Sequence, residues 1–72
     1  MRAVAMRDDW LEEARNRITR GEMMIARQRE LIAELRETNY STSIAEEVLH
    51  TLEGSQAMNI KHLSRLQRLK SG

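Results

Sequence analysis

The stretch Thr38-Asn39-Tyr40-Ser41-Thr42-Ser43 interrupts a sequence that favours helix on both sides. Asn39 stands where a helix ends by turning left-handed, a conformation that Asn tolerates better than any residue except Gly. The hydroxyls that follow suit the start of a second helix. Ser43 and Glu46 have the spacing of a capping box, and Ser41 is an alternative cap. A connection of about five residues joins antiparallel neighbouring helices. The sequence therefore predicts an α-helical hairpin with its turn at residues 38–43.

Length and composition agree with a small helical domain. The chain has 72 residues, no Pro, and only Trp10 and Tyr40 as aromatic side chains. It is rich in residues that favour helix, so we expect a single domain over residues 1–72. A chain this short buries too little apolar surface to be very stable as a single copy. The absence of Cys excludes a disulfide framework and any thiolate metal site.

Hydropathy and charge set the expected environment. No apolar run approaches the roughly 20 residues that cross a bilayer. The apolar residues near the start are cut short by Arg7-Asp8-Asp9, which does not suit a signal peptide. We expect a cytoplasmic protein without a membrane span. The net charge of +1 is too small to require a nucleic-acid or membrane partner.

The first helix is expected over about residues 8–37, and residues 1–7, which lack a clear cap, either fray or extend it. Asp8 and Asp9 are good caps, and Asp9 with Glu12 has the spacing of a capping box. A heptad repeat then follows, with Trp10, Met24 and Leu31 beside it. This stripe is wider than a two-stranded seam needs, which favours a four-helix bundle. The repeat consists of Leu11, Ala14, Ile18, Gly21, Ile25, Gln28, Ile32 and Leu35.

The second helix is expected over about residues 43–69, with Gly54 on its outer face. In an antiparallel hairpin, facing residues have numbers that sum to roughly 80, because both helices rise equally per residue. This register sets Gly21 opposite Asn59 and Ala14 opposite Leu66. The stripe of the second helix consists of Ala45, Val48, Leu49, Leu52, Gln56, Asn59, Ile60, Leu63 and Leu66.

Polar residues inside the stripe are the strongest candidates for a specific site. We interpret them as a hydrogen-bonded core layer that determines register and oligomeric state, as a buried Asn does in coiled coils. A small ligand or ion held by the amides is the alternative. The polar layer consists of Gln28, Ser55, Gln56 and Asn59.

The width of the apolar stripe predicts self-association. A lone hairpin would leave the sides of the stripe in water, so we expect a homodimer that forms an antiparallel four-helix bundle. The predicted core consists of Trp10, Leu11, Ile18, Gly21, Met24, Ile25, Leu31, Ile32, Leu35, Val48, Leu49, Leu52, Ile60, Leu63 and Leu66.

The sequence offers no candidate catalytic, cofactor-binding or metal-ligating residues. Glu47-Val48-Leu49-His50 has the Glu-x-x-His spacing of di-iron bundles. However, Glu47 and His50 point away from the apolar stripe, whereas a di-iron site projects inward. We therefore expect a protein that is not an enzyme and needs no cofactor.

The run Ile18-Thr19-Arg20-Gly21-Glu22, followed by Ile25-Ala26-Arg27-Gln28-Arg29, resembles a group of small uncharacterised helical-hairpin proteins of rhizobia and related alphaproteobacteria. Those proteins show a similar I-x-x-G-E-x-x-I-A-x-Q-R run, a turn like D-G-H-D-T and a second helix with A-x-x-L-L-x-x-L-E-x-x-Q. The resemblance covers roughly residues 10–66. It departs at the turn, where Asn39 replaces Gly and Ser41 replaces Asp. It implies a bacterial helical hairpin and carries no assigned activity.

The functional expectation is a protein–protein interaction or scaffold module that acts through self-association. A small RNA-binding hairpin dimer of the Rop type is one alternative, and an accessory subunit of a larger protein complex is another. Arg15, Arg17, Arg20, Arg27 and Arg29 favour RNA, but Glu12, Glu13, Glu22 and Glu30 interleave with them. Without a purely basic stripe, a nucleic-acid partner is disfavoured.

Overall fold

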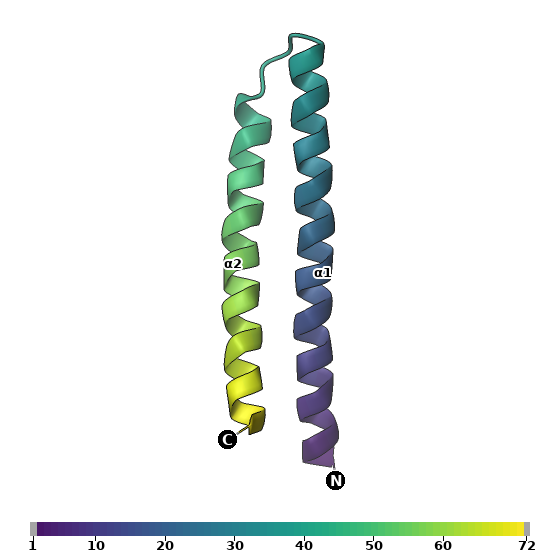
Figure 1. The fold of residues 1–72 in the computed structure, drawn as a ribbon, viewed down its shortest axis with the longest axis vertical. Coiled ribbons are helices and arrows are strands. Elements are labelled where there is room, and N and C mark those ends of the chain that lie inside the picture. Colours follow the sequence, from purple (N-terminus) through teal and green to yellow (C-terminus); the bar gives the residue numbers. More distant parts are fainter. Residues whose placement is uncertain (1, 72) are drawn as a thin grey trace.

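The computed structural model describes residues 2–71, with side chains from Asp9 onward. Helix α1 (Arg2–Glu37) and helix α2 (Ser43–Ser71) run antiparallel and pack along their lengths (Figure 1). No strand occurs in the described part of the chain. The predicted all-α hairpin is confirmed.

Helix α1 begins well before the expected start at Asp8. Asp8 and Asp9 lie inside the helix, so they are not its caps. The residues ahead of them, Ala3 to Met6, include neither Gly nor Pro, and nothing in that segment stops a helix. Good capping residues therefore marked a possible helix start that the chain does not use.

The end of α1 has the left-handed turn that Asn39 predicted. Asn39 has a φ of 62°. The backbone N–H of Tyr40 donates to the carbonyl of Leu35 at 2.8 Å, and that of Asn39 donates to Arg36 at 3.2 Å. These two bonds are those of a Schellman motif, which uses carbonyls that the last helical turn leaves without partners. The turn thereby reverses the chain.

Helix α2 is capped one residue earlier than the predicted capping box. Its first helical bond runs from the N–H of Glu46 to the carbonyl of Thr42, at 2.8 Å, which makes Thr42 rather than Ser43 the cap residue. The Thr42 hydroxyl donates to Glu46 Oε2 at 3.1 Å. Ser41 Oγ accepts a 3.4 Å bond from the N–H of Ser43. The hydroxyls do support the helix start, but Ser43 and Glu46 form no box.

The seam between the helices follows the predicted heptad repeat of α1. Leu11 and Ala14 are each 3% exposed, and every other repeat position is buried or half-buried. Arg36 pairs with Glu46, and Arg29 with Glu53, in agreement with the predicted antiparallel register. The seam residues on the other side are the cap residue Thr42 and, in α2, Ala45, Leu49, Leu52, Gln56, Asn59, Leu63 and Leu66.

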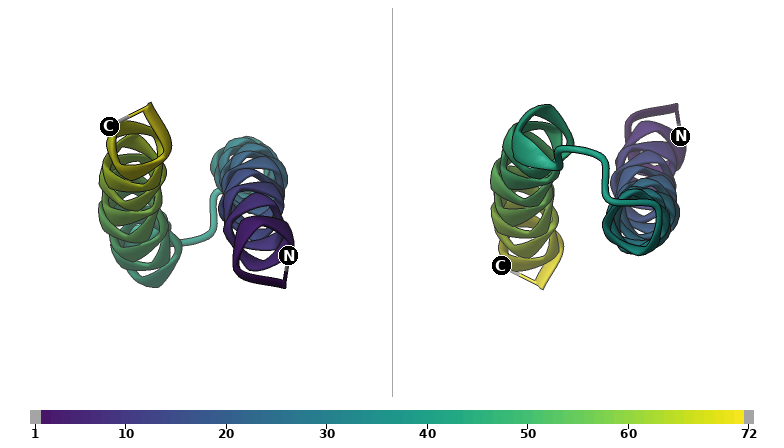
Figure 2. Two further views of the ribbon diagram at one scale, coloured as in Figure 1. Left: turned by 90° about the horizontal axis from the view of Figure 1, so that it is seen from below. Right: turned by 90° about the horizontal axis from the view of Figure 1, so that it is seen from above.

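The hairpin is a single layer of two helices with extents of 57 × 15 × 13 Å, as the end-on views show (Figure 2). Within residues 2–71, each helix has only the other as a neighbour. Several residues of the predicted oligomer core are consequently exposed in the single chain, namely Trp10, Met24, Leu31, Val48 and Ile60. The two-helix seam is too narrow to cover them.

Candidate interaction surface

The seam divides the long sides of the hairpin into two flanks of different character. Each residue advances about 100° around a helix. Residues one position before the column Leu11, Ile18, Ile25 and Ile32, such as Trp10 and Met24, therefore lie on one side of the seam. Residues four positions after members of the same column, such as Arg29 and Arg36, lie on the other. The α2 residues that form ion pairs with Arg29 and Arg36 show which positions of α2 lie on the second side.

The ion-paired flank is defined by Arg29, Arg36, Glu46 and Glu53. Arg36 Nη2 lies 3.0 Å from Glu46 Oε1, and Arg29 Nη2 lies 3.2 Å from Glu53 Oε2. All four side chains are exposed, so each pair stabilises the hairpin by only about 0–1 kcal/mol. Ile60 follows Glu53 by one heptad and so lies on this flank. Because of the cross-helix ion pairs, this flank is predominantly charged.

The opposite side, the apolar flank, collects most of the exposed large apolar side chains. Arg17 borders one hollow with His62 and Leu66 and a second with Met58 and Asn59, which shows that α1 and α2 contribute to the same side. The remaining members follow from helical periodicity. The apolar flank consists of Trp10, Met24, Leu31, Ile44, Val48, Met58 and Leu69.

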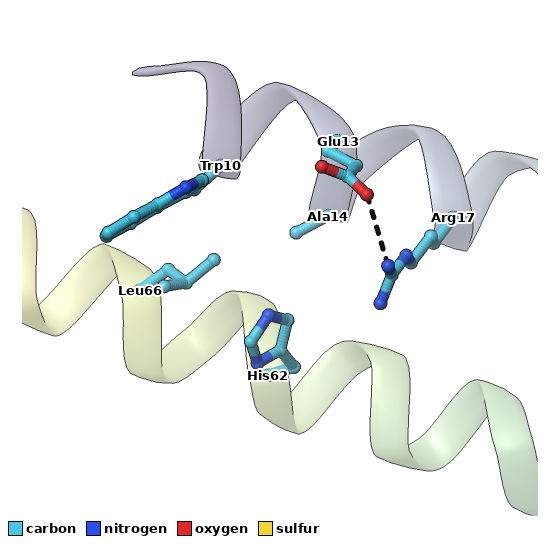
Figure 3. Close-up of a pocket in the computed structure, with 6 residues that line it drawn as sticks. All are labelled: Trp10, Glu13, Ala14, Arg17, His62 and Leu66. Carbon is cyan, nitrogen blue, oxygen red and sulfur yellow. Dashed lines mark hydrogen bonds and ion pairs between the residues drawn. The ribbon is translucent and has the colours of Figure 1, made fainter. Parts of the chain in front are cut away.

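An open hollow of about 210 Å³ lies on the apolar flank near the end opposite the turn (Figure 3). Trp10, Ala14 and Leu66 supply its apolar wall. Glu13 and Arg17 form a 3.1 Å ion pair at its edge, and the His62 ring approaches from α2. The hollow therefore combines an apolar surface with a polar rim, a combination that is common in protein contact sites.

The predicted polar layer forms two separate hydrogen-bonded sites. Gln56 is 8% exposed; its Nε2 donates to the carbonyl of Ile18 at 2.8 Å, and its Oε1 accepts from Asn59 Nδ2 at 3.2 Å. Nearer the turn, Gln28 Nε2 donates to the carbonyl of Ala45 at 2.9 Å. The bonds to Ile18 and Ala45 join α1 to α2 and hold their register, whereas the bond from Asn59 orients Gln56 within α2. Ser55, the remaining member of the predicted layer, is exposed.

Gly21 makes room for the buried Gln56 carboxamide. A Cβ atom at position 21 would overlap Gln56 Oε1 and stand 2.8 Å from Gln56 Cδ. Real Cβ atoms do not approach other heavy atoms so closely, so only Gly allows the present contact. The heptad pattern indicated a small residue at the seam, but it did not identify Gln56 as its partner.

The remaining predicted core residues lie where the seam and flanks meet. Leu49, Leu52, Leu63 and Leu66 are half-buried in the seam, as are Ile18, Ile25 and Leu35, whereas Ile32 is buried. The sequence analysis groups Trp10, Met24, Val48 and Ile60 in one predicted core, but the structure exposes all four and divides them between the two flanks. The sequence positions by themselves do not separate the two flanks, because the separation depends on the rotation of α2 against α1.

Glu47 and His50 are both exposed on α2. Among the described residues, no group of three or more His, Asp or Glu side chains is placed to hold a metal ion. Neither described helix combines the length and the apolar character that a membrane span needs.

Comparisons of the chain with protein-family models, curated proteins and solved structures found no match. The resemblance to rhizobial hairpin proteins therefore remains a prediction.

Proposed function

We propose that this chain is a non-enzymatic interaction module that acts through self-association. Two hairpins pack through their apolar flanks and form a four-helix bundle. The observation that carries this proposal is the asymmetry of the flanks. Large apolar side chains gather on one side of the seam, whereas cross-helix ion pairs occupy the other.

The size of the hairpin supports the same proposal. A face as long as the 57 Å hairpin and about as wide as its two helices offers on the order of 800 Å², which is what each partner contributes to a standard protein interface. A two-helix layer buries little surface by itself, and small domains commonly gain stability by oligomerisation. A second copy of the apolar flank would cover the exposed side chains of the first.

Sedimentation equilibrium at micromolar concentration tests the proposal. We expect a folded dimer, because a row of exposed large apolar side chains along one flank is uncommon in stable monomers. A well-folded monomer throughout this concentration range would contradict the proposal.

Met24 and Ile60 provide a matched pair of variants, since each is 53% exposed but they lie on different flanks. Met24→Gln places a polar group in the proposed interface twice per dimer, and we expect the dissociation constant to rise at least about tenfold. Ile60→Gln makes a comparable change outside the interface and should leave the dimer intact. Equal effects of the two variants would show that the apolar flank is not the interface.

A further inference from the structure

We propose that the two copies in the dimer are antiparallel, with their turns at opposite ends. This inference rests on the proposed self-association. Their two-fold axis passes between the copies beside Met58, so that α2 of one copy packs beside α2 of the other. The acidic half of each α2 then faces the basic half of its counterpart. This arrangement identifies the docking partner of the apolar flank as a second copy in one defined orientation.

Charge is segregated along α2. Its first half carries Glu46, Glu47 and Glu53, and no Lys or Arg occurs between Arg36 and Lys61. Its second half is basic, and no Asp or Glu follows Glu53. The helix dipole explains such charges only within the first and last turns. Glu53 and Lys61 lie in the middle of α2, so the segregation extends beyond what the dipole requires. The basic residues are Lys61, Arg65, Arg68 and Lys70.

Both charged halves border the apolar flank. Lys61 and Arg65 surround a hollow with Met58, and Arg68 extends the same basic cluster towards the end of α2. In the acidic half, Glu47 directly precedes Val48 of the apolar flank. Glu46 and Glu53 are paired with arginines of α1, whereas Glu47 and Arg68 form no cross-helix ion pair with the side chains described from Asp9 onward. Charges at the edge of an apolar contact commonly determine its orientation.

The positions of these charges suit a two-fold axis near Met58. Met58 lies close to the midpoint of α2 (Ser43–Ser71) and is 71% exposed. Glu47 and Arg68 lie at nearly equal separations on either side of it, each about 15 Å away at 1.5 Å per residue. Rotation by 180° therefore brings Glu47 of one copy to Arg68 of the other. If both copies pointed the same way, each α2 would instead lie beside the α1 of the other copy.

Distances between spin labels distinguish the two orientations. The chain has no Cys, so Tyr40→Cys introduces a single labelling site at the exposed turn. With opposite orientations, the two turns lie at opposite ends and the labels should be about 50 Å apart. With the same orientation, the labels should be within about 30 Å. Ala57→Cys, an exposed site near the axis, should give a short distance in the dimer and serves as the control.

The outcomes separate this inference from the proposed function. A distance of about 50 Å between the turns supports the opposite orientation. A short distance between the turns in a species that sediments as a dimer overturns the orientation and leaves self-association standing. A monomer by sedimentation overturns self-association and, with it, the orientation.

Charge reversal provides a second test. Glu47→Lys or Arg68→Glu places like charges opposite each other twice in the homodimer, and we expect each to raise the dissociation constant about tenfold. Mixing the two variants should restore association. In the heterodimer the introduced lysine faces the introduced glutamate, and the unchanged Arg68 of one copy faces the unchanged Glu47 of the other. These effects should weaken at high salt. A mixture that associates no better than either variant alone would overturn the orientation.

Discussion

At the scale of single residues, the two internal glycines have opposite roles. Gly21 lies at the seam against the carboxamide of Gln56, whereas Gly54 has open space around the position of a Cβ atom. Both lie inside helices, where Ala would be preferred by roughly 1 kcal/mol. The surroundings of each glycine therefore determine whether substitution by Ala raises or lowers the free energy of unfolding.

We expect Gly21→Ala to lower the free energy of unfolding by about 1–3 kcal/mol, because the carboxamide at the end of Gln56 must shift and its buried bond to Ile18 is lost. Gly54→Ala, the matched control, should raise it by up to about 1 kcal/mol. Urea denaturation monitored by circular dichroism, at one fixed protein concentration, measures both changes. Stabilisation by Gly21→Ala would contradict the observed contact.

The two seam glutamines should differ in their effect on stability. Gln56 is buried and bonded to both Ile18 and Asn59, whereas Gln28 is half-buried and makes one bond, to Ala45. We expect Gln56→Ala to cost about 1–3 kcal/mol and Gln28→Ala about 0.5–1.5 kcal/mol of unfolding free energy. If urea denaturation gave equal losses of unfolding free energy for the two variants, the greater burial of Gln56 would not contribute to stability.

At the scale of elements, the turn is determined by short-range chemistry. Asn39 adopts the left-handed conformation that ends α1, and the bonds from Asn39 and Tyr40 to carbonyls of α1 follow from it. Sequence alone predicted this conformation, because few other residues accept it. The start of α2 was harder to assign, because three adjacent hydroxyl residues are all acceptable caps. Thr42 takes the cap position, with its side chain bonded to Glu46.

Substitutions of Asn39 test the turn. Asn39→Gly should leave stability unchanged or raise it by up to about 1 kcal/mol, because Gly adopts a positive φ without steric cost. Asn39→Val should lower it by at least about 1–2 kcal/mol, because a β-branched side chain is strained there. Thermal and urea unfolding of both variants provide the comparison. A tolerated Val would show that the left-handed turn does not contribute to hairpin stability.

At the scale of the whole molecule, charge distribution bears on the RNA-binding alternative. Arg17 is paired with Glu13, and Arg29 with Glu53, so part of the predicted basic region is neutralised by neighbouring acids. We expect no specific retention of the protein on structured RNA at about 150 mM salt, and any binding at low salt should fall steeply as salt rises. Retention at about 150 mM that is lost in the Arg27→Ala/Arg29→Ala variant would favour RNA binding instead.

The helical hairpin, its turn and its seam followed from the sequence by itself. Apolar residues at alternating steps of three and four predicted the buried face of α1, and Asn39 predicted the reversal. These features depend on interactions between residues close in sequence, which residue type and spacing largely determine. The sequence left the early start of α1 undecided, because capping preferences identify acceptable helix starts without showing which one is used.

The two unlike flanks and the contact of Gln56 with Gly21 were decided only by the tertiary structure. Trp10, Met24 and Ile60 are all apolar residues beside the seam, and their sequence positions were compatible with one shared side. Packing α1 against α2 placed Trp10 and Met24 on the apolar flank and Ile60 beside the ion-paired residues. This separation depends on the rotation and register of one helix against the other, which the side chains meeting at the seam set together.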